Sequence, residues 1–169
     1  MAFEDAFAAL FADRSKPLYG YLSRLSGDPE LAEDLVQECF VKLYRRGAMP
    51  DDPPAWLVSV AHNLLRDDRR QQTRQGRLRL ERTVEVPTGD APAPADAAVL
   101  AAERVEAVRR ALARLPLRDR QLLLLRHEGY GYGEIANILQ LNPSGIGTML
   151  VRAGDSFRKA FHELFGASF

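Results

Sequence analysis

The chain has 169 residues, 46% of them hydrophobic, which suits one globular domain or two small ones and argues against disorder. Its 23 basic side chains balance its 23 acidic ones, but residues 66–82 hold seven arginines against three acids, and residues 28–38 hold five acids and no base. Nucleic acid therefore stays open as a partner, because a basic face can be balanced by acids elsewhere.

Several other classes are excluded. Cys39 is the one cysteine, so neither an intramolecular disulfide nor a cysteine zinc cluster can form, and the three histidines lack ligand spacing. No apolar stretch is long enough to cross a membrane, and the acidic N-terminus does not resemble a secretory signal. We expect a cytoplasmic protein without metal, cofactor or membrane insertion. No nucleophile with a base and no phosphate loop is present, so we do not expect an enzyme.

The first predicted module covers residues 1–75. Apolar residues recur at helical spacing from Ala2 to Leu25, with Pro17 as an expected kink or break. Gly27 ends this helix, and Asp28 is expected to cap the next one.

The second predicted helix runs to about Arg46, where a glycine and a proline-rich stretch stop it. A third helix starts near Pro54, with Trp56 expected in its core, and ends in an arginine-rich segment. These helices form a three- to four-helix module.

A proline-rich stretch follows, and we place a flexible linker at residues 76–98. The second module, residues 99–169, has four predicted helices, and Val105 and Val108 lie on the apolar side of the first. Neither module shows strand-like alternation, so we predict an all-α fold of two helical modules joined by a flexible linker. The four helices are expected at 99–115, 117–127, 134–139 and from 144 towards 164.

The second module contains the pattern of a helix-turn-helix motif. A short helix with Ile135 and Ala136 leads through Leu141-Asn142-Pro143 into a longer helix that Ser144 is expected to cap. An ordinary helical hairpin has the same local pattern, so DNA binding is one of two interpretations.

Two polar surfaces stand out in the first module. The second helix places acidic and amide side chains on one stripe, with the residues Asp34, Gln37, Glu38 and Lys42. The third helix places polar and basic side chains away from Trp56, which suits contacts to phosphates and base edges. They are Ser59, His62, Asn63, Arg66, Arg69, Arg70 and Arg74. Each surface alone is also compatible with an ordinary solvated face.

Four segments in order resemble the extracytoplasmic-function class of RNA polymerase sigma factors. The resemblance covers nearly the whole chain outside the linker. The segments are AEDLVQECFVKLYRR (32–46), WLVSVAHNLLRDDRR (56–70), LARLPLRDRQLLLLR (112–126) and GYGEIANILQLNPSGIGTMLVRA (131–153).

The resemblance implies a role for each surface. The stripe on the second helix would dock on the clamp coiled coil of the largest subunit of core RNA polymerase. The segment from Arg45 and Arg46 to Pro54 would pocket a flipped base of the minus-ten element, and the third helix would contact that element. The second module would bind the flap of the second-largest subunit and place its last helix on the minus-thirty-five element of promoter DNA. An anti-sigma protein is a further possible partner.

The last helix departs from the family pattern at its start. The expected DNA contacts there are Ser144, Gly145, Gly147, Thr148 and Arg152, and two positions that are usually basic are not basic here. The upstream element would be read weakly, or the helix would approach the DNA unusually closely. Both alternatives stay open.

Two other functions compete with a sigma factor. A polymerase-independent helix-turn-helix regulator would use only the second module and leave the arginine-rich helix without a task. A sigma-like mimic would sequester an anti-sigma protein instead of directing transcription.

Overall fold

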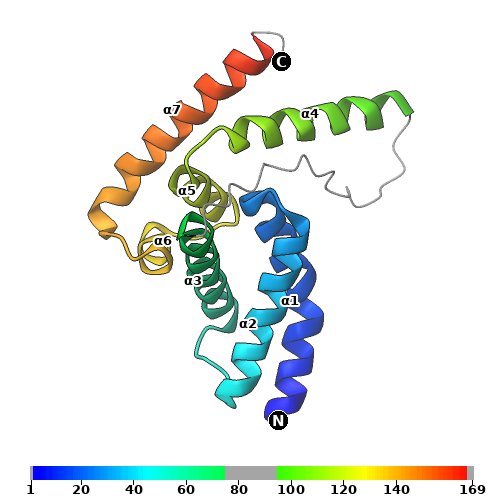
Figure 1. The fold of residues 1–169 in the computed structure, drawn as a ribbon, viewed down its shortest axis with the longest axis vertical. Coiled ribbons are helices and arrows are strands. Elements are labelled where there is room, and N and C mark those ends of the chain that lie inside the picture. Colours follow the sequence, from blue (N-terminus) through cyan, green and yellow to red (C-terminus); the bar gives the residue numbers. More distant parts are fainter. Residues whose placement is uncertain (1, 75–94, 167–169) are drawn as a thin grey trace. The chain divides into compact units, whose positions relative to one another are not determined.

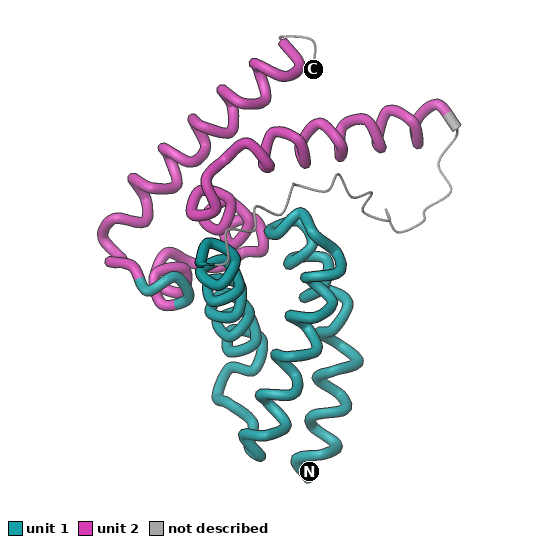
Figure 2. The backbone as a smooth tube through the Cα atoms, in the orientation of Figure 1, with its two compact units in different colours: residues 1–84, 138–140 teal, residues 85–137, 141–169 magenta. Residues whose placement is uncertain are grey.

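The computed structural model describes residues 2–74 and 95–166, and these residues form seven α-helices and one short 3-10 helix, with no strand among them (Figure 1). They fall into two compact units, which Figure 2 colours separately. Unit 1 comprises residues 1–84 with 138–140, and unit 2 comprises residues 85–137 with 141–169. The all-α, two-module prediction is confirmed.

The predicted linker, residues 76–98, lies mostly outside the described residues. Its last four residues, 95–98, are helical and form the first turn of α4 (Ala95–Ala113). The helix therefore begins earlier than the expected start of the second module at residue 99, because alanines with an acid in the first turn favour a helix.

Unit 1 is a bundle of α1 (Phe3–Ser26), α2 (Pro29–Arg46) and α3 (Pro53–Arg74), each of which packs against the other two. The core consists of one apolar side of each helix. Its fully buried members include Leu22, Leu25, Cys39, Leu43, Leu57 and Leu65.

The boundaries of α1 and α2 follow from the caps that the sequence predicts. Gly27 ends α1 with φ +68°, a left-handed conformation that glycine adopts without steric cost. The Asp28 carboxylate then accepts a hydrogen bond from the backbone N–H of Leu31 at 3.1 Å. Asp52 caps α3 in the same way, accepting from the backbone N–H of Ala55 at 3.1 Å.

The expected break at Pro17 was wrong, because α1 runs from Phe3 to Ser26 without interruption. The exposed Pro17 is followed closely by the buried residues Leu18, Tyr21 and Leu22. Burial of this side against the rest of unit 1 offsets the hydrogen bond that proline cannot donate.

Unit 2 contains α4, α5 (Leu117–His127), α6 (Tyr132–Leu139) apart from its last two residues, the 3-10 helix η1 (Pro143–Gly145) and α7 (Ile146–Phe165). The long α7 packs against both α4 and α5. Ala111, Leu115 and Ala160 form a buried cluster between α4 and α7, with aromatic residues of α7 against it.

The apolar side of α4 differs from the predicted one. Val105 and Val108 are exposed, whereas Ala107 and Ala111 are buried. Small side chains allow α4 and α7 to approach closely, and this packing decides which side faces inward. None of the described helices has the length and apolar character of a membrane span.

Candidate nucleic-acid interface

The acidic stripe of unit 1 lies on the exposed side of α2. We use this name for Asp34, Gln37, Glu38 and Lys42. Glu38 is half-buried and the other three are exposed. The opposite side of the same helix is buried in the unit 1 core. The structure therefore places these four residues on one helix with their polar groups accessible to a partner.

The basic face of unit 1 lies on α3 and consists of Asn63, Arg66, Arg69, Arg70 and Arg74. Asn63, Arg70 and Arg74 are exposed, and the other two arginines are half-buried, as is Ser59 in the preceding turn. The helix carries four arginines and two aspartates, a net charge of +2. One of these aspartates, Asp68, accepts a hydrogen bond from the side chain of Gln72 at 2.7 Å.

His62 does not belong to this face, so its prediction as a DNA contact was wrong. The side chain is fully buried, and its Nε2 lies 2.7 Å from the hydroxyl of the buried Tyr21 on α1. A buried polar ring needs a hydrogen-bond partner, and Tyr21 supplies one across the α1–α3 contact. His62 therefore helps to fix α3 against α1, while its neighbour Asn63 faces solvent.

Trp56 was expected in the core, and it is half-buried in the first turns of α3. Arg45 and Arg46 are exposed in the last turn of α2, directly before the loop that joins α2 to α3. Cations are stabilised at a helix C-terminus, so these two arginines have a structural advantage there as well as the charge to contact DNA.

Cys39 is enclosed between α2 and α3, and its thiol lies 3.8 Å from the backbone oxygen of Leu57. Burial raises the pKa of this thiol to about 12, with a further contribution from the charge of Glu38. A thiol in this state is a packing group rather than a nucleophile.

The helix-turn-helix segment of unit 2 is formed by α6, η1 and α7. The backbone N–H of Gly131 donates to the Glu134 carboxylate at 2.7 Å, which ties down the start of α6. Ile135 and Ala136 are buried, as the motif requires.

The expected cap at Ser144 was wrong, because no side-chain cap hydrogen bond forms at the start of α7, and Asn142 caps the preceding 3-10 helix instead. The side-chain oxygen of Asn142 accepts from the backbone N–H of Ser144 at 3.1 Å and from its hydroxyl at 2.9 Å. The turn continues as η1, and α7 itself begins at Ile146. Ser144 therefore lies inside the turn that Asn142 caps, two residues before the first residue of α7, and not at the cap position of that helix.

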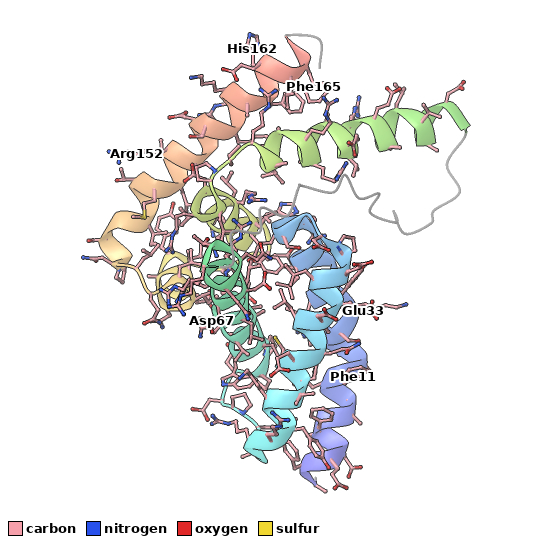
Figure 3. The ribbon with its side chains drawn as sticks, viewed as in Figure 1. Phe11, Glu33, Asp67, Arg152, His162 and Phe165 are labelled. Atoms are coloured by element: carbon pink, nitrogen blue, oxygen red, sulfur yellow. The ribbon has the colours of Figure 1, made fainter. Side chains whose placement is uncertain are left out.

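The five contacts predicted at the start of the last helix differ in exposure. Ser144, Thr148 and Arg152 are exposed, and Gly145 and Gly147 are half-buried. Within unit 2, Arg152 projects from α7 on the side away from α4 (Figure 3).

Sequence reasoning missed a cluster beside this helix. The guanidinium of Arg126 lies 5.5 Å from the ring centre of Tyr132 and donates to the backbone oxygen of Tyr130 at 3.1 Å. A Cβ atom added at Gly147 would lie 3.4 Å from the Tyr132 ring, so this ring rests against the first turn of α7. Tyr132, an aromatic residue at the start of α6, is the sequence feature that could have indicated this cluster. Across the described ranges, no cluster of three potential metal ligands occurs.

Comparison with known proteins defines the class of this chain. Residues 10–75 match the family model of sigma-70 region 2, and residues 105–153 match that of sigma-70 region 4. The chain therefore has the two modules of a sigma-70 transcription factor, in the expected order.

The extracytoplasmic-function group is indicated by similar whole proteins. The chain is 27% identical over 160 residues to the ECF RNA polymerase sigma factor SigK of Mycobacterium sp. (strain JLS), covering 91% of this chain and 80% of that protein. It is 27% identical over 164 residues to the RNA polymerase sigma factor CarQ of Myxococcus xanthus, covering 95% and 92%. The chain belongs to the extracytoplasmic-function sigma factors of RNA polymerase, which recognise promoters.

The fold also resembles a solved structure. It matches the sigma factor RpoE of Bartonella quintana, crystallised in complex with the anti-sigma factor NepR, with a TM-score of 0.73 and 20% identity. The match covers 97% of this chain and 99% of that chain.

Proposed function

We propose that this sigma factor binds core RNA polymerase through the acidic stripe, holds melted minus-ten DNA on the basic face, and reads an upstream element with α7. The observation that supports the proposal is the separation of two polar surfaces within unit 1. The acidic stripe and the basic face occupy different helices, each accessible, while the apolar sides of the same helices form one core.

The acidic stripe suits a partner helix of positive charge, for which we propose the clamp coiled coil of the largest polymerase subunit. Complementary charges speed association and fix the register of two helices. Asp34 and Gln37 are exposed one turn apart, so a partner helix lying along α2 can contact both. We further propose that unit 2 binds the flap of the second-largest subunit.

The basic face suits DNA that has lost its pairing. The arginines neutralise phosphates and release counterions, and Asn63 offers a paired donor and acceptor to a base edge. Unstacking a base costs a few kcal/mol, and contacts to the extruded strand must offset that cost. We assign the loop after Arg45 and Arg46 to the capture of a flipped base.

The first experiment tests core binding. We expect Asp34→Arg combined with Gln37→Ala to weaken binding to core polymerase by about tenfold, because the charge complementarity is reversed. Glu4→Arg is the matched control, since Glu4 is an exposed acid on α1, outside the stripe. Equal affinities for both variants and the unaltered protein would remove the docking assignment.

The second experiment separates melting from docking. Asn63→Ala combined with Arg70→Ala should leave core binding intact and reduce promoter opening, measured with a fluorescent base in the minus-ten element. Lys16→Ala removes an exposed cation from α1 and should leave opening unchanged. Normal opening by the double variant would contradict the role of the basic face.

The mimic stays a second candidate because the start of α7 has few basic side chains. Sigma factors are generally non-enzymatic initiation factors, and we propose that this protein catalyses no reaction and works in the cytoplasm beside the polymerase. We also propose an anti-sigma partner, as the Bartonella quintana protein has. Transcription by core enzyme with this protein distinguishes the initiation factor, which directs transcripts, from the mimic, which does not.

A further inference from the structure

The exposed side of α7 combines methyl groups with a single cation. Three exposed residues share one side of the helix: Thr148, Val151 and Arg152. The opposite side carries the buried Ile146 and Ala153. Val151 is 64% exposed, the highest value for a large hydrophobic side chain among the described residues. An aliphatic side chain with this exposure contributes little to the unit 2 core and is available to a partner.

The charges around Val151 leave Arg152 as the cation available for a partner. Asp155, one turn further on, forms an ion pair with Arg158. Arg152 takes part in no ion pair within the described part of the chain. The surface therefore presents two methyl-bearing side chains beside one positive charge.

The segment that leads into this surface contains two glycines and therefore few side-chain atoms. A Cβ atom added at Gly145 would meet no atom within 4 Å, and one added at Gly147 would meet only the Tyr132 ring at 3.4 Å. The Tyr132 ring covers Gly147, whereas the open space at Gly145 lets the backbone directly before α7 approach a flat or grooved partner closely. Short side chains such as Thr148 and Val151 then reach the same depth as longer ones on an ordinary helix.

We propose that Val151 and Thr148 read thymine methyl groups in the major groove of the upstream promoter element, with Arg152 as the adjoining polar contact. This inference rests on the proposed function and names the base feature that α7 recognises. Thymine is the one base that presents a methyl group in the major groove, and threonine methyls and small apolar side chains contact it. Of the two alternatives raised by the glycines, the proposal favours close approach over weak reading.

The test uses core polymerase with the full-length protein on a promoter mapped from its own transcripts. Each thymine of the upstream element is replaced in turn by deoxyuridine, which removes only the methyl group. We expect one or two positions at which the affinity for the promoter falls about fourfold, the value of one buried methyl-sized group. Val151→Ser should abolish this difference between thymine and uracil at one of those positions.

Val99→Ser is the matched control, since Val99 on α4 is 57% exposed and lies outside the helix-turn-helix segment. It should keep the full difference between thymine and uracil. Equal affinity for thymine and uracil at every position, or an unchanged difference in Val151→Ser, would overturn the inference while promoter-directed transcription continues. The absence of promoter-directed transcription would overturn the proposed function and this inference together.

Discussion

The hydrogen bond between Tyr21 and His62 gives the sharpest prediction about unit 1. Tyr21→Phe removes the hydroxyl that lies 2.7 Å from Nε2 of the fully buried His62 and keeps the ring. Depriving a buried polar atom of its partner costs about 1–3 kcal/mol. We expect the free energy of unfolding of unit 1 to fall by about 2 kcal/mol, or about 30-fold in its folding equilibrium constant.

The assay is urea unfolding followed by tryptophan fluorescence. Trp56 is the one tryptophan of the chain and lies in unit 1, so its emission reports on this unit alone. Tyr44→Phe is the control, because Tyr44 is 56% exposed, and its loss of a hydroxyl should change stability by less than about 0.5 kcal/mol. Equal midpoints for Tyr21→Phe and Tyr44→Phe would refute the structural role assigned to His62.

Four further predictions concern single residues. Burial raises the pKa of Cys39 from 9.0 to about 12. The native protein should therefore resist alkylation by iodoacetamide at pH 8, whereas the protein unfolded in guanidinium should react fully. Rapid labelling of the native protein would contradict the burial. The raised pKa also makes the stability of unit 1 depend on pH. Between pH 9 and about 12 the thiol ionises in the unfolded chain but not in the folded one, so the free energy of unfolding should fall as the pH rises through this range. Below pH 9 the contribution of Cys39 should be fully present. Gly154→Ala should stabilise unit 2 by about 1 kcal/mol in thermal unfolding, because alanine favours a helix interior over glycine. The added Cβ has room, since its nearest atom is the flexible end of the Arg158 side chain at 3.8 Å. A lower melting temperature would mean that the Cβ does not fit. Asp28→Ala should cost unit 1 about 1 kcal/mol in the urea assay, and no change would mean that the cap bond is unimportant.

Local signals in the sequence predicted the junction between α1 and α2 well. Gly27 and Asp28 act within a few residues of themselves, so their conformations follow from their own chemistry. The acidic stripe on α2 could also be predicted, because helical periodicity alone decides which residues of a helix share a side.

Three of the failures depended on contacts between helices. Pro17 stays within α1 because buried neighbours hold the helix together, and Val105 is exposed because α4 packs through alanines. His62 lies three residues before the buried Leu65, which places it on the inner side of α3. Its partner, Tyr21, is 41 residues away in the sequence, and no local pattern links the two.

The assignment of α7 required the structure for a different reason. The glycines at its start are visible in the sequence, but their effect depends on what surrounds them. The space beside Gly145 is open, whereas the Tyr132 ring lies against Gly147, so only the first of these glycines leaves room for a partner. Neither fact follows from spacing or composition.

Sequencing the transcripts made on genomic DNA by core RNA polymerase, with and without this protein, tests the central claim most directly. The account predicts new start sites that share one pair of promoter elements, and their loss when Asp34→Arg with Gln37→Ala replaces the unaltered protein. An identical set of transcripts with and without the protein would contradict it.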